Sequence, residues 1–238
     1  MIEISKKITT NVGRINAQFG LIKENDRIMI GFSGGKDSLT LLHTLNRMQK
    51  KAPFKFDFKA VTITYGMGEQ IEFLSNHCKE HGIEHEIIDT QIFDLAGEKI
   101  RKNSSFCSFF SRMRRGYLYT TALEQGYNKV ALGHHLDDAM ESYFMNLFYN
   151  GTMRTMPPIY KASNGLEVIR PLIFCRERQL RAFADSNEIR VIGDEACPGL
   201  RFDVKMPHAR AATKELLAKL EEQNPKIFVS MKAAFSNI

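Results

Sequence analysis

A glycine-rich bend between a short apolar run and a helical pattern constrains the fold more than any other stretch of the chain. Residues 28–32 read as a buried strand, and apolar residues recur at helical spacing from Leu39 onward. Between them stands the sequence Ser33-Gly34-Gly35-Lys36-Asp37-Ser38. A helix that begins here directs free N–H groups and its positive dipole end at the bend, which glycines leave open to an anion. The bend therefore predicts an anion site, with Ser33, Lys36 and Ser38 as further donors.

This bend does not match the common phosphate loop G-x-x-x-x-G-K-[ST]. Three residues separate Gly31 from Gly35, and Lys36 is followed by Asp37. The pattern S-G-G-x-D-S instead resembles the pyrophosphate-binding loop of the N-type ATP pyrophosphatases. That resemblance implies an enzyme that cleaves ATP between its α and β phosphates and thereby adenylates an oxygen atom.

Strand and helix patterns alternate along most of the chain. Strands are expected at 28–32, 58–64, 83–88, 129–132, 166–169 and 189–192, and helices at 3–20, 37–50, 69–81, 108–125, 135–149, 176–187, 207–222 and 225–235. The segment between 150 and 165 is expected to be irregular. Such alternation predicts right-handed βαβ units in an α/β fold with a doubly wound parallel sheet. We expect an N-terminal helix over 1–22, a main domain over 23–195, and a C-terminal loop with helices over 196–238.

Composition limits the cellular compartment and the kinds of partner that we expect for this protein. The chain has 238 residues, 43% of them hydrophobic, which is enough for a substantial core. No apolar run approaches the ~20 residues of a membrane span, and the N-terminus lacks the apolar centre of a signal peptide. We therefore expect a cytoplasmic protein without a membrane partner, in which four cysteines are more often buried, catalytic or metal-bound than disulfide-bonded. The net charge of +6 points weakly to a polyanionic partner.

A second motif, Gly133-His134-His135-Leu136-Asp137-Asp138, lies where a predicted strand meets a predicted helix. The carboxyl ends of parallel strands form the ligand crevice of such sheets, so this motif should face the glycine-rich bend. Asp137 or Asp138 could hold Mg²⁺ on phosphates, and His134 could contact a phosphate or the reacting oxygen. An aspartate that only caps the following helix is the alternative interpretation.

Positive charge is densest just before the middle of the chain. Arg112, Arg114 and Arg115 fall within four residues of each other and could hold the phosphates of RNA or of a nucleotide. A solvated helix face is the alternative here, and it is the favoured interpretation for Arg176, Arg178 and Arg181.

Several motifs together are similar to those of the tRNA 2-thiocytidine synthetase family, whose relatives include the lysidine and thiouridine synthetases. These motifs are S-G-G-K-D-S, C-S-x-x-S-R-M-R-R-G, A-L-G-H-H-x-D-D, F-Y-N-G-T-M-R-T-M-P-P and I-R-P-L-I-F-C-R-E, and the similarity runs from about residue 8 to 200. It implies the adenine nucleotide alpha hydrolase-like PP-loop fold. It also implies adenylation of the O2 carbonyl of a cytosine in the tRNA anticodon loop, followed by replacement of that oxygen with sulfur. The family uses ATP, Mg²⁺ and an iron–sulfur cluster held by three cysteines.

The resemblance also assigns roles to individual residues. It implies nucleotide binding by Ser33, Gly34, Gly35, Lys36, Asp37, Ser38, Gly133 and His134, a catalytic part for Asp37, and metal contacts for Asp137 and Asp138. The basic cluster would contact tRNA. A sulfur-donor protein and a homodimer are further expectations.

The chain departs from the family pattern at the cluster ligands. Where the family has C-x-x-C, this chain has Cys107-Ser108-Phe109-Phe110, so Phe110 replaces one ligand. Cys197 matches the third family cysteine, and Asp194 stands where a nearby family cysteine would be. An iron–sulfur cluster normally takes four cysteine ligands, and two would leave an unstable site.

Three interpretations of this departure stay open. Asp194 could replace the lost thiolate and keep an altered cluster. Alternatively, Cys107 and Cys197 could act without a cluster, one as a persulfide and the other as the resolving thiol. Or the sulfur chemistry is lost, and the protein adenylates another acceptor or only binds nucleotide or RNA. We expect little bound iron.

Cys78 and Cys175 are expected in the core, and no metal site is expected from His77, His81 and His85, because Gly82 interrupts their helix.

Overall fold

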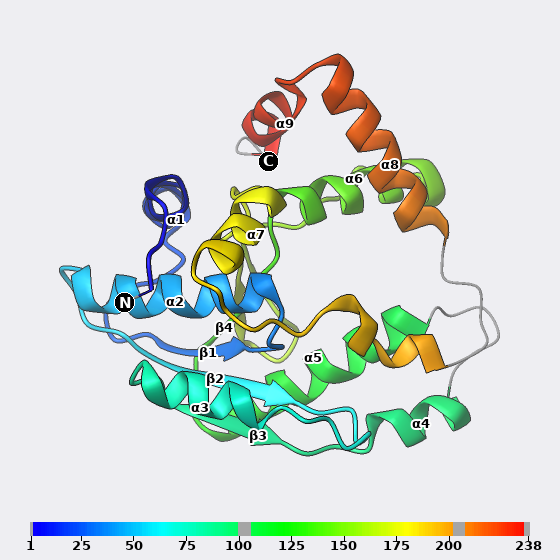
Figure 1. Cartoon of the computed structure of the whole chain (residues 1–238). Coiled ribbons are helices and arrows are strands. Elements are labelled where there is room, and N and C mark those ends of the chain that lie inside the picture. Colours follow the sequence, from blue (N-terminus) through cyan, green and yellow to red (C-terminus); the bar gives the residue numbers. More distant parts are fainter. Residues whose placement is uncertain (1, 100–105, 202–207, 236–238) are drawn as a thin grey trace.

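The computed structural model describes residues 2–99, 106–201 and 208–235, and within this part a six-stranded sheet forms the centre of the molecule (Figure 1). Across the sheet the strands follow the order β3 (His85–Ile88), β2 (Asp57–Ile63), β1 (Arg27–Gly31), β4 (Lys129–Ala131), β6 (Glu167–Ile169) and β5 (Ile159–Lys161). All neighbours are parallel except β5, which pairs antiparallel with β6.

Helices cover both faces of this sheet. They are α1 (Lys6–Phe19), α2 (Lys36–Lys51), α3 (Glu72–Glu80), α4 (Ile92–Lys99), α5 (Phe106–Glu124), α6 (Leu136–Asn150), α7 (Glu177–Ser186), α8 (His208–Gln223) and α9 (Ile227–Phe235), with short 3₁₀ helices η1 (Asp194–Ala196) and η2 (Pro198–Arg201). Side chains alternate along β1: Ile28 and Ile30 enter the core with α1, α2 and α7, whereas Met29 enters the core under α4 and α5. The predicted doubly wound α/β fold is confirmed. None of the described helices has an apolar stretch that could span a membrane.

The order of winding reverses between β1 and β4. From β1 the chain proceeds outward to β2 and β3, and it then returns to place β4 on the other side of β1. In open parallel sheets this switch point leaves a crevice at the carboxyl ends of the two strands. The two motifs that follow β1 and β4 are therefore adjacent.

Two predictions about the second half of the chain were wrong. Residues 189–192 form no strand; the backbone there is irregular, and the Ile192 N–H donates to the carbonyl of Gly34 at 2.8 Å. Residues 159–161, predicted to be irregular, form the edge strand β5. Short apolar runs do not reveal whether a segment joins a sheet or packs on a loop, because tertiary contacts decide.

Gly34 is the point where the bend is most tightly packed. Its φ is +77°, and a Cβ there would lie 2.7 Å from Ile192 Cδ1 and 2.9 Å from Leu74 Cδ2. We predict that Gly34→Ala lowers the free energy of unfolding by about 2–4 kcal/mol, through left-handed strain and overpacking. Urea unfolding would measure it. Gly116→Ala is the matched control, because its Cβ meets nothing within 4 Å and it should be neutral or stabilising. Equal stability of the Gly34 variant and the control would contradict this account.

Candidate functional site

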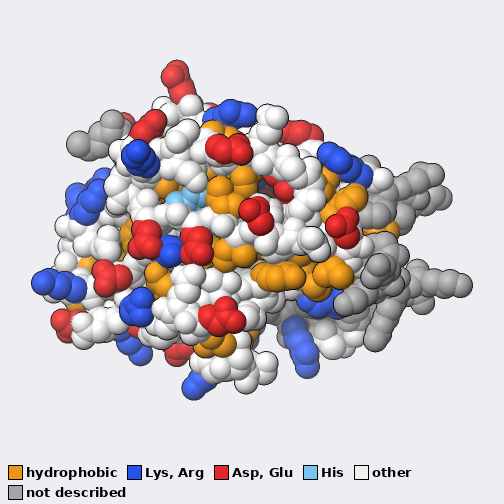
Figure 2. Space-filling view, turned by 90° about the horizontal axis from the view of Figure 1, so that it is seen from below, with side chains coloured by type: hydrophobic (Ala, Val, Ile, Leu, Met, Phe, Trp, Pro, Cys, Tyr) orange, Lys and Arg blue, Asp and Glu red, His pale blue; other side chains and the backbone are white. Residues whose placement is uncertain are grey.

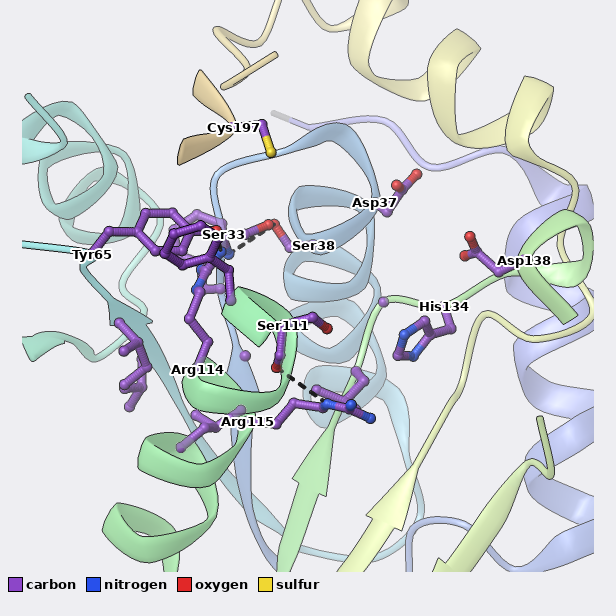
Figure 3. Close-up of a pocket in the computed structure, with 18 residues that line it drawn as sticks. Ser33, Asp37, Ser38, Tyr65, Ser111, Arg114, Arg115, His134, Asp138 and Cys197 are labelled. Carbon is purple, nitrogen blue, oxygen red and sulfur yellow. Dashed lines mark hydrogen bonds between the residues drawn. The ribbon is translucent and has the colours of Figure 1, made fainter. Parts of the chain in front are cut away.

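A pocket of about 380 Å³ opens at the switch point (Figure 3). Its wall is built from the bend after β1, the end of β2, one face of α5, the loop after β4 and the segment before η2. The side chains labelled in Figure 3 are Ser33, Asp37, Ser38, Tyr65, Ser111, Arg114, Arg115, His134, Asp138 and Cys197. Residues from five distant stretches of the sequence thus share one cavity.

The hydroxyl groups of the bend hold its backbone in shape. The Ser33 N–H donates to Ser38 Oγ at 3.2 Å, and Ser38 Oγ donates to the Gly35 carbonyl at 3.0 Å. Gly35 is the N-cap of α2 and supplies no side-chain cap for the N–H groups of the first turn. The helix end therefore presents donors and a positive dipole at the cavity, as an anion site requires.

The two motifs touch through their backbones. A Cβ on Gly133 would lie 3.1 Å from the Asp37 carbonyl carbon and 3.2 Å from Ser38 N. Only a residue without a side chain allows the loop after β4 to approach the start of α2 this closely. Both motifs consequently face one ligand-sized space.

Asp37 carries an unpaired carboxylate oxygen at this junction. Its Oδ2 is 3.3 Å from Lys36 Nζ, but its buried Oδ1 has no hydrogen-bond partner. Burial raises the pKa of Asp37, although His135 and Lys36 oppose this rise. An orphaned buried carboxylate oxygen has the character of an unfilled cation ligand.

His135 connects Asp37 with Asp138. Its Nδ1 accepts from the Asp138 N–H at 3.3 Å, and Asp138 Oδ2 accepts from the His135 N–H at 3.1 Å, so the pair forms a capping box for α6. His135 Nε2 is 3.4 Å from Asp138 Oδ2 and 3.9 Å from Asp37 Oδ1. The Asp37 and Asp138 carboxylates thus flank one imidazole, and carboxylates are among the ligands that Mg²⁺ prefers, together with water and phosphate oxygens.

Asp137, predicted as a magnesium ligand, has other partners. Its carboxylate accepts from Arg176 Nε at 3.1 Å and from the Glu177 N–H at 2.7 Å, at the N-terminus of α7. It does not line the pocket. Arg176, predicted to be solvated, is bound between Asp137 and Glu221. Asp138 also has partners, but it lines the pocket together with Asp37, so these two carboxylates are better placed than Asp137 to contact a bound cation.

His134 is half-buried beside Arg170. The Arg170 Nε–H donates to His134 Nδ1 at 3.3 Å, so the neutral ring carries its proton on Nε2. Burial lowers the pKa of His134 to about 4, which keeps the ring neutral at pH 7. His134 can therefore donate one hydrogen bond to a ligand without adding a charge.

Lys36 lies beside the pocket wall and does not line it. Its Nζ is 3.3 Å from Asp37 Oδ2 and 3.2 Å from Glu177 Oε1. Burial tends to raise the pKa of Glu177, but Lys214 and Lys36 outweigh burial and hold it at about 2. Lys36 therefore fixes the start of α2 against α7. Gly34 and Gly35 do not line the pocket either, and the bend residues that do are Ser33, Asp37 and Ser38.

Two residues from the predicted sulfur-transfer region line the pocket: Cys197, which supplies a thiol, and Phe110, which supplies an aromatic ring. The Cys197 thiol points toward the bend in Figure 3. Phe110, 2% exposed, packs edge-on against Tyr65 and Phe109, with ring centroids 5.5 and 5.6 Å apart. Cys107 lies in the first turn of α5 and Asp194 in η1, but their side chains lie outside the described residues.

The remaining cysteines cannot complete a metal cluster here. Cys78 and Cys175 are buried in the opposite core, and burial raises the pKa of each thiol to about 12. Among the described side chains, Cys197 is thus the only thiol in the pocket, and an apolar ring occupies the neighbouring wall. These residues do not fit a three-cysteine iron–sulfur cluster.

Two of the three clustered arginines line the pocket. Arg114 Nη1 donates to Tyr65 Oη at 2.9 Å, and Arg115 Nε donates to the Ser111 carbonyl at 3.3 Å. Arg112 is exposed and lies outside the pocket lining. In contrast, acidic and basic side chains are interspersed over the face that Figure 2 shows, which gives a polyanion little net attraction there. The arginines of α5 are therefore better candidates for nucleic-acid phosphates than the side chains of that face.

Sequence reasoning missed three polar partners of the site. Arg170 sets the tautomer of His134, Arg210 donates to Asp138 Oδ1 at 2.7 Å, and Tyr65 holds Arg114. Arg170 belongs to the motif I-R-P-L-I-F-C-R-E, and this motif could have identified it as a residue of the site. Arg210 and Tyr65 belong to no such pattern, because the fold alone brings them to the pocket.

Comparison with known proteins agrees with this geometry. A family model described as "PP-loop domain" matches residues 4–205. The chain is 43% identical over 236 residues to a tRNA-cytidine(32) 2-sulfurtransferase of Geobacter metallireducens, covering 98% of this chain and 90% of the relative. It is 38% identical to the protein of that name from Pseudomonas syringae pv. syringae, with 99% and 85% covered.

Two solved structures share the fold. The U34-tRNA thiolase NcsA from Methanococcus maripaludis, solved with its [4Fe-4S] cluster, superposes with a TM-score of 0.79 at 24% identity, covering 98% of this chain and 78% of that one. The NH₃-dependent NAD synthetase from Campylobacter jejuni gives a TM-score of 0.55 at 18% identity, with 98% and 91% covered.

Proposed function

Because the chain belongs to the PP-loop family and, within it, to the ATP-dependent tRNA-cytidine(32) 2-sulfurtransferases, we propose that it adenylates the O2 carbonyl of cytidine 32 in tRNA and replaces that oxygen with sulfur. The observation that carries the proposal is the pocket, in which an anion-binding helix start, a carboxylate pair and a thiol line one cavity. A carbonyl oxygen is a poor leaving group, and adenylation allows it to depart as part of AMP.

The first half of the reaction uses the two loop motifs. The cytidine O2 attacks the α-phosphorus of ATP, a P–O bond forms, and pyrophosphate leaves. The N–H groups at the start of α2 stabilise the charge on the departing pyrophosphate, and the His134 Nε2–H donates to the transferring phosphoryl group or the reacting oxygen. Asp37 and Asp138 would hold Mg²⁺, which supplies charge neutralisation for the leaving phosphates.

The second half uses Cys197. A donor of persulfide sulfur, predicted to be a protein, loads Cys197, and the terminal sulfur attacks C2 of the activated cytosine while AMP leaves with O2. A second thiolate then attacks Cys197 Sγ, which releases 2-thiocytidine and leaves a disulfide for an external thiol to reduce. We assign this second thiolate to Cys107, the other cysteine of the pair predicted to act without a cluster.

We predict that the protein carries little iron even when purified without oxygen. The reason is that Phe110 places a buried aromatic ring where a third cysteine would be needed. Iron and acid-labile sulfide analysis would test this, with a Phe110→Cys variant as the comparison that restores the family pattern. Near-stoichiometric iron that disappears in a Cys107→Ser variant would contradict a cluster-free mechanism.

We predict that Arg112→Ala weakens tRNA binding and lowers the slope of log K against log salt by about 1, because one phosphate contact is lost. Filter binding over a range of salt concentrations would measure both. Arg178→Ala on α7 is the matched control, since this side chain is exposed and lies outside the pocket lining. Equal effects of the two substitutions would place the tRNA surface elsewhere.

A deletion strain would test the function itself. Nucleoside analysis of its tRNA should show cytidine in place of 2-thiocytidine, and the wild-type chain should restore the thiolated nucleoside. Retained 2-thiocytidine in the deletion strain would rule out the proposed role. A cytoplasmic location and a homodimer stay predictions.

A further inference from the structure

Three histidines from two helices converge at a place that the proposed reaction does not use. His43 lies on α2, His77 lies on α3, and His81 is the C-cap of α3. One ring nitrogen from each histidine lies within 4.8 Å of the other two, and His43 Nε2 is 2.7 Å from His77 Nε2. None of the three lines the catalytic pocket. His43 is seven residues beyond Lys36, which is about 10 Å along the helix from the bend.

The spacing on α3 presents two ligands on one face. His77 and His81 are four residues apart, so their rings project from the same side of the helix toward α2, with ring centroids 4.6 Å apart. The His43 ring lies 5.0 Å from His77 and 4.8 Å from His81. His43 is buried, with 4% exposure, whereas the other two are half-buried and leave a path for an ion to enter.

Burial favours the neutral form of two of these rings, His43 and His77. Burial, followed by the charges of His77, His81 and Lys50, lowers the pKa of His43 to about 3. Burial and then His81 lower the pKa of His77, although the nearby Glu80 opposes this shift. A neutral imidazole offers a lone pair, which is the form that binds a metal.

The distances suit a tetrahedral ion. Zinc–nitrogen bonds of about 2.0–2.1 Å place tetrahedral ligand atoms roughly 3.4 Å apart. The 2.7 Å contact must therefore open slightly, and the longer separations must close by roughly 1.4 Å at most, which rotation of half-buried rings can supply. Imidazole ligands favour zinc and the neighbouring transition metals over magnesium or calcium.

We propose that His43, His77 and His81 bind one divalent ion of the zinc class, with water in the fourth position. The ion joins α3 to α2. Because the first turn of α2 forms the anion site, the ion also stabilises the position of the helix that follows the bend. Without an ion, the hydrogen bond between His43 and His77 and the edge-on ring contacts join these side chains. This inference is independent of the proposed thiolation.

Metal binding by the tag-free full-length chain tests the proposal. After equilibration with ZnCl₂ and dialysis, elemental analysis should find one zinc per chain. A zinc concentration about a hundredfold above Kd should raise Tm by about 5–10 °C. Substitution with Co²⁺ should give the intense visible absorption of a four-coordinate site. His77→Ala and His81→Ala should each lose the zinc, the thermal shift and the cobalt spectrum.

His85→Gln is the matched control. His85 follows His81 by four residues, but its ring contacts Thr62 and Ser75 and lies outside the cluster. This variant should bind one zinc as the wild type does. Absence of stoichiometric zinc and of the cobalt spectrum in the wild type would overturn the proposal, and so would undiminished zinc binding by the His77 and His81 variants. The cobalt spectrum of the wild type keeps the test decisive even if a variant fails to fold.

Discussion

The Cys197→Ser variant is expected to release pyrophosphate from ATP in the presence of tRNA while forming no detectable 2-thiocytidine. A serine hydroxyl cannot carry a persulfide, so the second half-reaction loses its nucleophile. The first half keeps all of its groups, because the bend, His134 and the carboxylate pair are unchanged. Quantifying labelled pyrophosphate and thiolated nucleoside from the same reaction would separate the two steps.

Cys175→Ala is the control for this experiment. This substitution removes a thiol that is buried in the core away from the pocket. The folded variant should therefore still form 2-thiocytidine, even if the substitution lowers its stability. Full thiolation by the Cys197 variant would show that another group carries the sulfur. Loss of pyrophosphate release in that variant would show that Cys197 also supports adenylation, which this account does not predict.

Asp37→Asn should lower the rate of pyrophosphate release by about 10²–10³, as loss of one preorganised electrostatic contact does in other enzymes. The amide keeps the shape of the side chain and removes the charge that would hold Mg²⁺ beside Asp138. The bend keeps its N–H groups, so the affinity for ATP without magnesium should be little changed. Quenched-flow measurement of pyrophosphate, with magnesium titrated, would show the loss.

The same substitution should not destabilise the fold. Burial raises the pKa of Asp37, which means that the charged carboxylate is less favourable in the ligand-free folded protein than in the unfolded chain. Removing this charge should leave Tm unchanged or raise it at neutral pH. Asp57→Asn, at the exposed start of β2, is the control that should leave the rate unchanged. An unchanged rate for the Asp37 variant would remove this residue from the mechanism.

Local patterns were sufficient for the elements that build the crevice. The strand before Ser33 and the strand before Gly133 were read from apolar runs, and the parallel-sheet rule placed their ends together. The contact between Gly133 and Asp37 bears out that reasoning in detail. The pattern could not say which of two adjacent aspartates faces the cavity, because that depends on Arg176 and Glu177, which lie forty residues downstream.

The histidine cluster shows a second reason why sequence reasoning fell short. Spacing within one helix pointed to His77, His81 and His85, and the break at Gly82 argued against a site. The third histidine comes instead from α2, thirty-four residues earlier, and only packing of the two helices brings it near. Ligands contributed by different elements leave no periodic signal in the sequence.

The most direct test of the central claim is the stoichiometry of products from ATP labelled on its α-phosphate, with unmodified tRNA and a persulfide source present. We predict that one AMP and one pyrophosphate appear for each 2-thiocytidine, because the bend and the loop after β4 act on a single ATP. Formation of ADP and phosphate, or of 2-thiocytidine without AMP, would contradict the account.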